Sequence, residues 1–79
     1  MDPVDAAHRF LEAMGTPAAL AFVGPEAAPM FLQSAPPDEI LDLVMKRNLI
    51  FVSWRRGDAT GTWIWSFDRD GRLINWAKA

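Results

Sequence analysis

The sequence predicts a single α+β domain, residues 1–79, in which N-terminal helices pack on a three-stranded antiparallel β-meander. Before residue 49, apolar side chains recur at three- and four-residue spacing, which is typical of helices. From residue 49 onward they alternate with a period of two, which is typical of strands. Two glycine-containing turn signals divide this second part into strands at about 49–56, 60–67 and 72–78.

The first helix is predicted over residues 3–14. Asp2 is a suitable N-cap and Pro3 suits the first helical position. Gly15 ends the helix because it readily adopts the left-handed conformation found after helix ends. Its apolar stripe contains Val4, Ala7, Phe10, Leu11 and Met14.

A second, short and buried helix is expected over residues 18–23, after Thr16-Pro17 and before Gly24-Pro25. Residues 24–36 contain several prolines, so we expect a loop with one short strand or helical turn around Met30–Gln33.

A third helix is predicted to begin at Pro37 and to end at Asn48. Two acidic residues follow Pro37 and the basic pair Lys46-Arg47 precedes Asn48, which complements the helix dipole. A wide apolar stripe lies between them: Ile40, Leu41, Leu43, Val44 and Met45.

The turns predict how the strands pair. A two-residue turn at Gly57-Asp58 places Val52 opposite Trp63 and Phe51 opposite Ile64. A type I turn at Asp68–Gly71, with glycine in the bulge position, leads to the third strand. The expected pairs of this second hairpin are Phe67 with Leu73, Ile64 with Trp76 and Ser66 with Ile74.

This register gives the sheet two apolar faces. One face carries Ile50, Val52, Trp54, Trp63, Trp65, Phe67 and Leu73, and we expect the helices to cover it. The other carries Phe51, Ile64, Ile74 and Trp76, surrounded by polar and basic side chains, which is typical of an interaction surface. The alternative is that a helix packs on each face and leaves neither open.

Composition limits the possible functions. A chain of 79 residues is marginally stable alone, and the absence of cysteine excludes disulfides and thiolate metal sites. We expect no metal and no cofactor, and oligomerisation is the remaining stabilising device. No apolar run reaches the length of a membrane span, and the acidic N-terminus does not resemble a signal peptide. We therefore expect a cytoplasmic protein that does not enter a membrane.

Charge is divided unevenly along the chain. Residues 1–45 hold seven acidic side chains and one basic one, whereas residues 46–79 hold three acidic and seven basic ones. This division favours attraction between the two halves of the domain, or between subunits, over a nucleic-acid surface.

Few residues suggest catalysis, and no catalytic residue is predicted. His8 and Glu12 share a helix face, but no nucleophile accompanies them, so we interpret them as a surface pair. Asp68 and Asp70 are explained by turn formation rather than calcium binding. Arg55-Arg56 resembles a charged hairpin end more than a phosphate site.

Two further functions stay open. Trp54, Trp63 and Trp65, with Met30 and Phe31, could line a cavity for a small molecule. A single-stranded nucleic acid could stack on the aromatic face while basic residues bind its phosphates. The side chains expected in that second role are Phe51, Trp76, Arg55, Arg72 and Lys78.

The stretch from Trp63 to Ile74, read with the preceding helices, resembles the end of the nuclear-transport-factor-2-like or SnoaL-like superfamily, in which a late hairpin turns on Asp-Gly. The resemblance implies a cone-like α+β fold and sheet-to-sheet dimerisation. The acid-base residues of the family's enzymes have no counterpart here, so none is assigned. The function that we expect is a small non-enzymatic protein-binding module, a homodimer or a partner of another protein.

Overall fold

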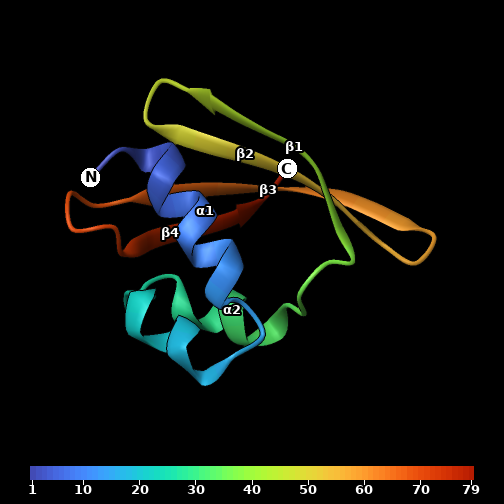
Figure 1. Cartoon of the computed structure of the whole chain (residues 1–79), viewed down its shortest axis with the longest axis horizontal. Coiled ribbons are helices and arrows are strands. Elements are labelled where there is room, and N and C mark those ends of the chain that lie inside the picture. Colours follow the sequence, from blue (N-terminus) through green and yellow to red (C-terminus); the bar gives the residue numbers. More distant parts are fainter.

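The computed structural model describes residues 1–79 and shows an α+β fold with a four-stranded antiparallel sheet. The elements are α1 (Pro3–Ala13), the 3₁₀ helix η1 (Pro17–Phe22), α2 (Ala28–Gln33), β1 (Glu39–Lys46), β2 (Leu49–Arg56), β3 (Ala59–Phe67) and β4 (Leu73–Lys78). The strands follow one another in the order β1-β2-β3-β4 (Figure 1). The predicted fold class is confirmed, with one strand more than expected.

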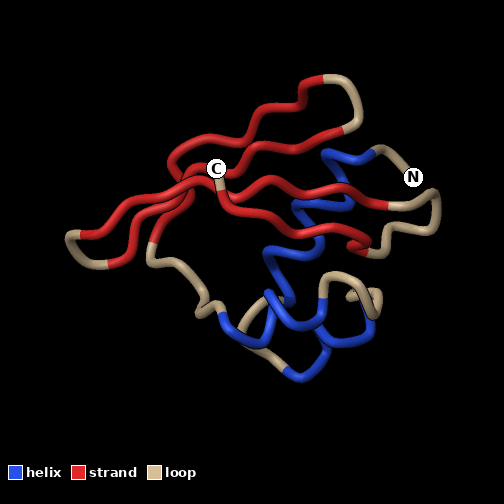
Figure 2. Tube along the Cα trace, turned by 180° about the vertical axis from the view of Figure 1, so that it is seen from behind, coloured by secondary structure: helices blue, strands red, loops and turns tan.

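The helices lie on one side of the sheet. α1 crosses in front of the strands in Figure 1, and η1 and α2 lie beside β4 at the lower end of α1. The view from behind shows the strands with no helix laid over them (Figure 2). After η1 the chain touches β4, because the Gly24 N–H donates to the Leu73 carbonyl at 2.8 Å. One face of the sheet is therefore covered and the other is open.

The N-terminal helix forms as expected. The Asp2 carboxylate accepts a hydrogen bond from the Val4 N–H at 2.7 Å, and Pro3 occupies the first turn. Gly15 follows the helix with a φ of 89°. α1 buries its side chains Ala6, Ala7 and Phe10 against the sheet.

The second and third predicted segments are helical in part. The expected buried helix at 18–23 is the 3₁₀ helix η1, but only Ala19 within it is buried, and Leu20 is 53% exposed. The turn of helix expected around Met30–Gln33 is α2.

The helix predicted from Pro37 to Asn48 is wrong, because Glu39–Lys46 forms strand β1. Leu41 has no partner on β2, since Ile40 pairs with Trp54 and Asp42 pairs with Ser53. This β-bulge interrupts the alternation of apolar side chains and makes the stripe resemble a helical one. Pairing with β2 across the short Arg47-Asn48 turn prevails over local helix propensity.

The first predicted hairpin is confirmed residue by residue. Val52 pairs with Trp63 and Phe51 pairs with Ile64, as the Gly57-Asp58 turn implies. The Gly57 φ of 58° matches the positive value that such turns require.

The second hairpin differs from the predicted register. Phe67 pairs with Leu73 as expected, but Ser66 pairs with Asn75, so Ile74 bulges out without a partner. Beyond the bulge every residue of β4 is shifted by one position, and Trp76 pairs with Trp65 instead of Ile64. A shift of one residue moves a side chain to the other face of the sheet. Trp76 therefore points into the core.

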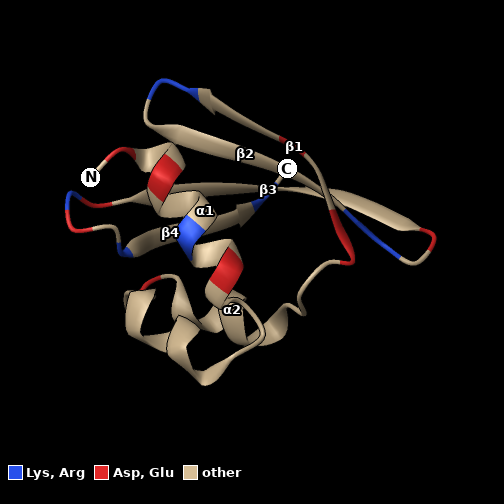
Figure 3. Ribbon diagram, viewed as in Figure 1, with Lys and Arg blue, Asp and Glu red and all other residues tan.

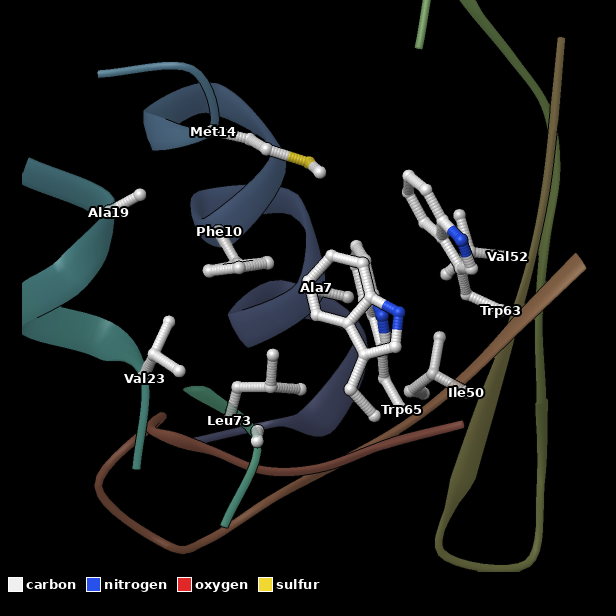
Figure 4. Packing of buried hydrophobic residues seen from close by; sticks show 12 residues of the cluster. Ala7, Phe10, Met14, Ala19, Val23, Ile50, Val52, Trp63, Trp65 and Leu73 are labelled. Carbon is white, nitrogen blue, oxygen red and sulfur yellow. The ribbon is translucent and has the colours of Figure 1, made fainter. Parts of the chain in front are cut away.

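The core forms between α1 and the covered face of the sheet (Figure 4). The Phe10 ring meets Trp65 edge-on at 5.1 Å and Trp76 at 6.0 Å, the geometry that aromatic pairs prefer. All seven side chains predicted for this face belong to the core or pack against it. The indole N–H groups of Trp54, Trp65 and Trp76 are buried without a protein acceptor, and each such donor costs the free energy of its desolvation.

Candidate functional site

An apolar row crosses the open face of the sheet. Val44 pairs with Phe51, Phe51 with Ile64, and Ile64 with Ala77, so the four side chains stand side by side on adjacent strands. None of the four packs against the core cluster. We call Val44, Phe51, Ile64 and Ala77 the outer row.

Mostly polar side chains border the outer row, with Leu49 beside Lys46 as an apolar exception. Asp42, Ser53 and Thr62 stand in the neighbouring row, where the Ser53 and Thr62 hydroxyls lie 3.4 Å apart. On the other side the Lys46 ammonium lies 5.7 Å from the centre of the Phe51 ring, a cation–π contact. An apolar strip with a polar border has the anatomy of a protein contact surface.

The outer row is accessible to a partner. Val44 is 37% exposed, and Phe51 and Ile64 are half-buried by their neighbours within the sheet. The broad side of the molecule measures 34 × 28 Å, which accommodates the roughly 800 Å² per partner of a standard interface.

The predicted interface residues divide into three groups. Phe51 and Ile64 do lie on the open face, in adjacent strands. Ile74 stands apart from them at the β4 bulge, 39% exposed beside Gly24. Trp76 is 5% exposed and belongs to the core, so its assignment to an interaction surface is wrong.

The sequence reasoning missed Val44 and Ala77 in the outer row. Val44 was placed on a helix, and Ala77 was one position out of register because of the bulge. A signal for Val44 existed, since Arg47-Asn48 separates two apolar segments in the manner of a two-residue hairpin loop.

Trp54, Trp63 and Trp65 lie together on the covered face. The Trp63 ring is 5.1 Å from Trp54 and 5.6 Å from Trp65, nearly parallel to the latter. They form a continuous stack along the sheet, and neither hollow in the structure is lined by any of them. The closely packed indole rings themselves fill the space in which we expected a ligand.

The arginines of the β2–β3 hairpin are engaged by the chain itself. Arg55 pairs with the Glu39 carboxylate at 3.2 Å. Arg56 lies 4.9 Å from the Trp54 ring centre and donates hydrogen bonds to the Ala35 and Pro36 carbonyls. These contacts hold the segment before β1 and the start of β1 against the hairpin. Both arginines therefore have a structural role, and a phosphate site is not needed to account for them.

The other polar residues considered for catalysis or metal binding either organise a turn or do not contact each other. The Asp68 carboxylate accepts from the N–H groups of Asp70 and Arg72, each at 2.9 Å, and so organises the β3–β4 turn. His8 and Glu12 are exposed, and no hydrogen bond joins them. No three metal-ligating side chains of the chain come together.

The basic residues proposed for nucleic-acid phosphates come from different elements, since Arg55 belongs to β2 and Lys78 to β4. The Lys and Arg positions are spread over the whole ribbon in Figure 3. Arg72 donates to the Val23 carbonyl at 3.2 Å, and Arg55 is paired with an acid. With Trp76 in the core, the predicted stacking platform loses one of its two aromatic rings.

One apolar hollow lies away from the open face. It has a volume of about 350 Å³ and is formed where the end of α1 meets η1 and α2. Its apolar lining comes from Met14, Leu20, Phe31 and Leu32.

Comparisons of the chain with models of protein families, with curated proteins and with solved structures found no match. Every helix in the structure is too short or too polar to cross a lipid bilayer.

Proposed function

We propose that this chain is a small, non-enzymatic protein-binding module, and that the outer row is its contact surface. One observation carries the proposal: four apolar side chains line up across a sheet face that no helix covers. A second copy of the chain or another protein is the partner that such a surface fits, because apolar strips with polar borders are buried in protein interfaces.

The energetics favour this use of the face. Burying a large apolar side chain contributes roughly 1.5–3 kcal/mol, and the outer row offers Phe51, Ile64 and Val44. The polar groups at its border include the Ser53 and Thr62 hydroxyls and the Lys46 ammonium, and a polar rim is what surrounds the apolar centre of protein interfaces. The resemblance to the nuclear-transport-factor-2-like superfamily implies helices packed into a sheet and sheet-to-sheet dimerisation, and we keep this resemblance as part of the proposal.

Replacing Ile64 with glutamate tests the proposal, because it places a charge in the middle of the outer row. Thr60→Glu is the matched control, since Thr60 lies on the same strand and the same face but at the hairpin end, opposite Arg55. The readout is pull-down of a bound partner, or the difference in sedimentation between the two variants of the pure protein. We expect Ile64→Glu to abolish the association that is made through the outer row and Thr60→Glu to preserve it. Equal association of both variants, with folding verified by circular dichroism, would refute the proposal.

A second candidate function is binding of an apolar small molecule, and the hollow between α1, η1 and α2 is the observation that favours it. Its volume of about 350 Å³ falls at the lower end of the range for ligand sites. Leu20 is 53% and Leu32 is 70% exposed, so two large apolar side chains flank it. An environment-sensitive hydrophobic dye should bind wild type and lose affinity in Leu20→Ser. Unchanged binding in that variant would place the dye elsewhere.

A further inference from the structure

Strand β1 forms a free margin of the sheet. It pairs with β2 on one side and with no strand on the other (Figure 1). At the opposite margin, β4 is partly protected by its bridge between Leu73 and Val23. A free strand presents unpaired N–H and C=O groups that favour the addition of another strand. β1 also exposes three apolar side chains: Leu41 (50%), Val44 (37%) and Met45 (47%).

Only one of the three charged side chains of β1 forms an ion pair within the chain. Glu39 is paired with Arg55, but neither Asp42 nor Lys46 takes part in an ion pair within the chain. Both lie on the open face, opposite Ser53 and Leu49. Four residues of extended chain separate them by roughly 13 Å, so they do not reach each other. Figure 3 shows the acidic middle and the basic end of this strand.

We propose that β1 pairs antiparallel with β1 of a second copy, about a two-fold axis at Val44. In this register Val44 lies opposite Val44, Leu43 lies opposite Met45, and Asp42 lies opposite Lys46 of the other copy. Residues opposite each other in a sheet must share a face, and each of these pairs does. The result is an eight-stranded antiparallel sheet with an Asp42–Lys46 ion pair on each side of the axis.

Other registers are less favourable. A shift of one residue would pair side chains from opposite faces, which the alternation of a strand forbids. A shift of two residues would place Asp42 or Lys46 opposite Val44 and separate the charges. The proposed register therefore pairs side chains of the same face and also places opposite charges next to each other.

This pairing would also join the apolar surfaces of the two copies. Val44 is the first member of the outer row, so the row would continue across the axis into that of the second copy. On the covered face, Leu43 packs against the core cluster and would meet the exposed Met45 side chain of the other copy. The inference concerns the sheet edge and does not require the outer row to bind anything.

A charge-exchange experiment tests this register. Lys46→Asp places two acids opposite each other in the homodimer, and Asp42→Lys places two lysines there. We expect each variant alone to dimerise about tenfold more weakly than wild type, as measured by sedimentation at low salt. An equimolar mixture of the two variants restores opposite charges at both contacts, so we expect dimerisation to recover. A monomeric wild type, or a mixture no tighter than its components, overturns the inference.

The outer-row variant separates this inference from the proposed function. Ile64 lies two strands away from the free edge, so edge pairing should persist in Ile64→Glu. Edge pairing is overturned if Ile64→Glu is monomeric and if mixing Lys46→Asp with Asp42→Lys does not restore the dimer. Dimerisation would then be assigned to the outer row. Hydrogen exchange supplies an independent readout: amides of β1 should become more protected as protein concentration rises, whereas those of β4 should not.

Discussion

Trp76→Ala is the substitution that most directly tests how the last strand is registered. The Trp76 ring centre lies 4.9 Å from that of Trp63 and 5.2 Å from that of Trp65. It also contacts Phe10 and Phe31, at 6.0 and 5.9 Å. Removing a buried tryptophan costs about 3–5 kcal/mol. Because a domain of 79 residues has a free energy of unfolding of roughly 4–12 kcal/mol, this loss is a large fraction of the total.

Ile74→Ala is the matched control, two positions earlier on the same strand. Ile74 sits at the bulge and is 39% exposed, so its truncation should cost well under the roughly 2–5 kcal/mol of a buried isoleucine. Thermal unfolding followed by far-ultraviolet circular dichroism measures both variants. We expect Trp76→Ala to lower the melting temperature by more than about 12 °C and Ile74→Ala by a few degrees. A reversed order of the two effects would show that Trp76 faces outward and that β4 has no bulge.

Two further substitutions test local features of the fold. An ideal Cβ at Gly61 would approach the Trp54 ring to 2.5 Å, so Gly61→Val should destabilise the hairpin by about 1–3 kcal/mol, measurable by urea unfolding. Preserved stability would mean that the ring moves aside freely. Asp68→Ala removes the acceptor of the Asp70 and Arg72 N–H groups and should cost about 1 kcal/mol, with Asp68→Asn costing less. An Asp68→Ala variant as stable as wild type would mean that these two hydrogen bonds contribute little to the turn.

Local signals in the sequence predicted much of the fold. α1 follows from its cap, its proline and its apolar stripe, and the β2–β3 pairing follows from the Gly57-Asp58 turn. These elements are regular, so counting residues along them keeps every side chain on the right face. The seven side chains predicted for the covered face therefore all lie on it, whereas Ile40, Leu43 and Trp76, which also lie there, were not predicted.

The two errors in the sheet, at β1 and at β4, share one physical cause, which is a β-bulge. At Leu41 the bulge breaks the alternation of β1 and imitates a helical stripe. At Ile74 it shifts β4 by one residue and carries Trp76 from the open face to the core. Neither bulge has glycine as its extra residue, the sequence mark of one bulge class, because the extra residues are Leu41 and Ile74. The open apolar face was predicted correctly in its centre, at Phe51 and Ile64, and incorrectly at its margins.

The position of α1 in the chain has a consequence for biosynthesis. Phe10 emerges from the ribosome early, but the rings that it packs against, Trp65 and Trp76, belong to the last two strands. The nascent helix can contact η1, α2 and the first two strands, but Phe10 lacks its two tryptophan partners until β3 and β4 have been synthesised. A variant without β4 would leave Phe10 without the Trp76 ring and the aromatic core incomplete.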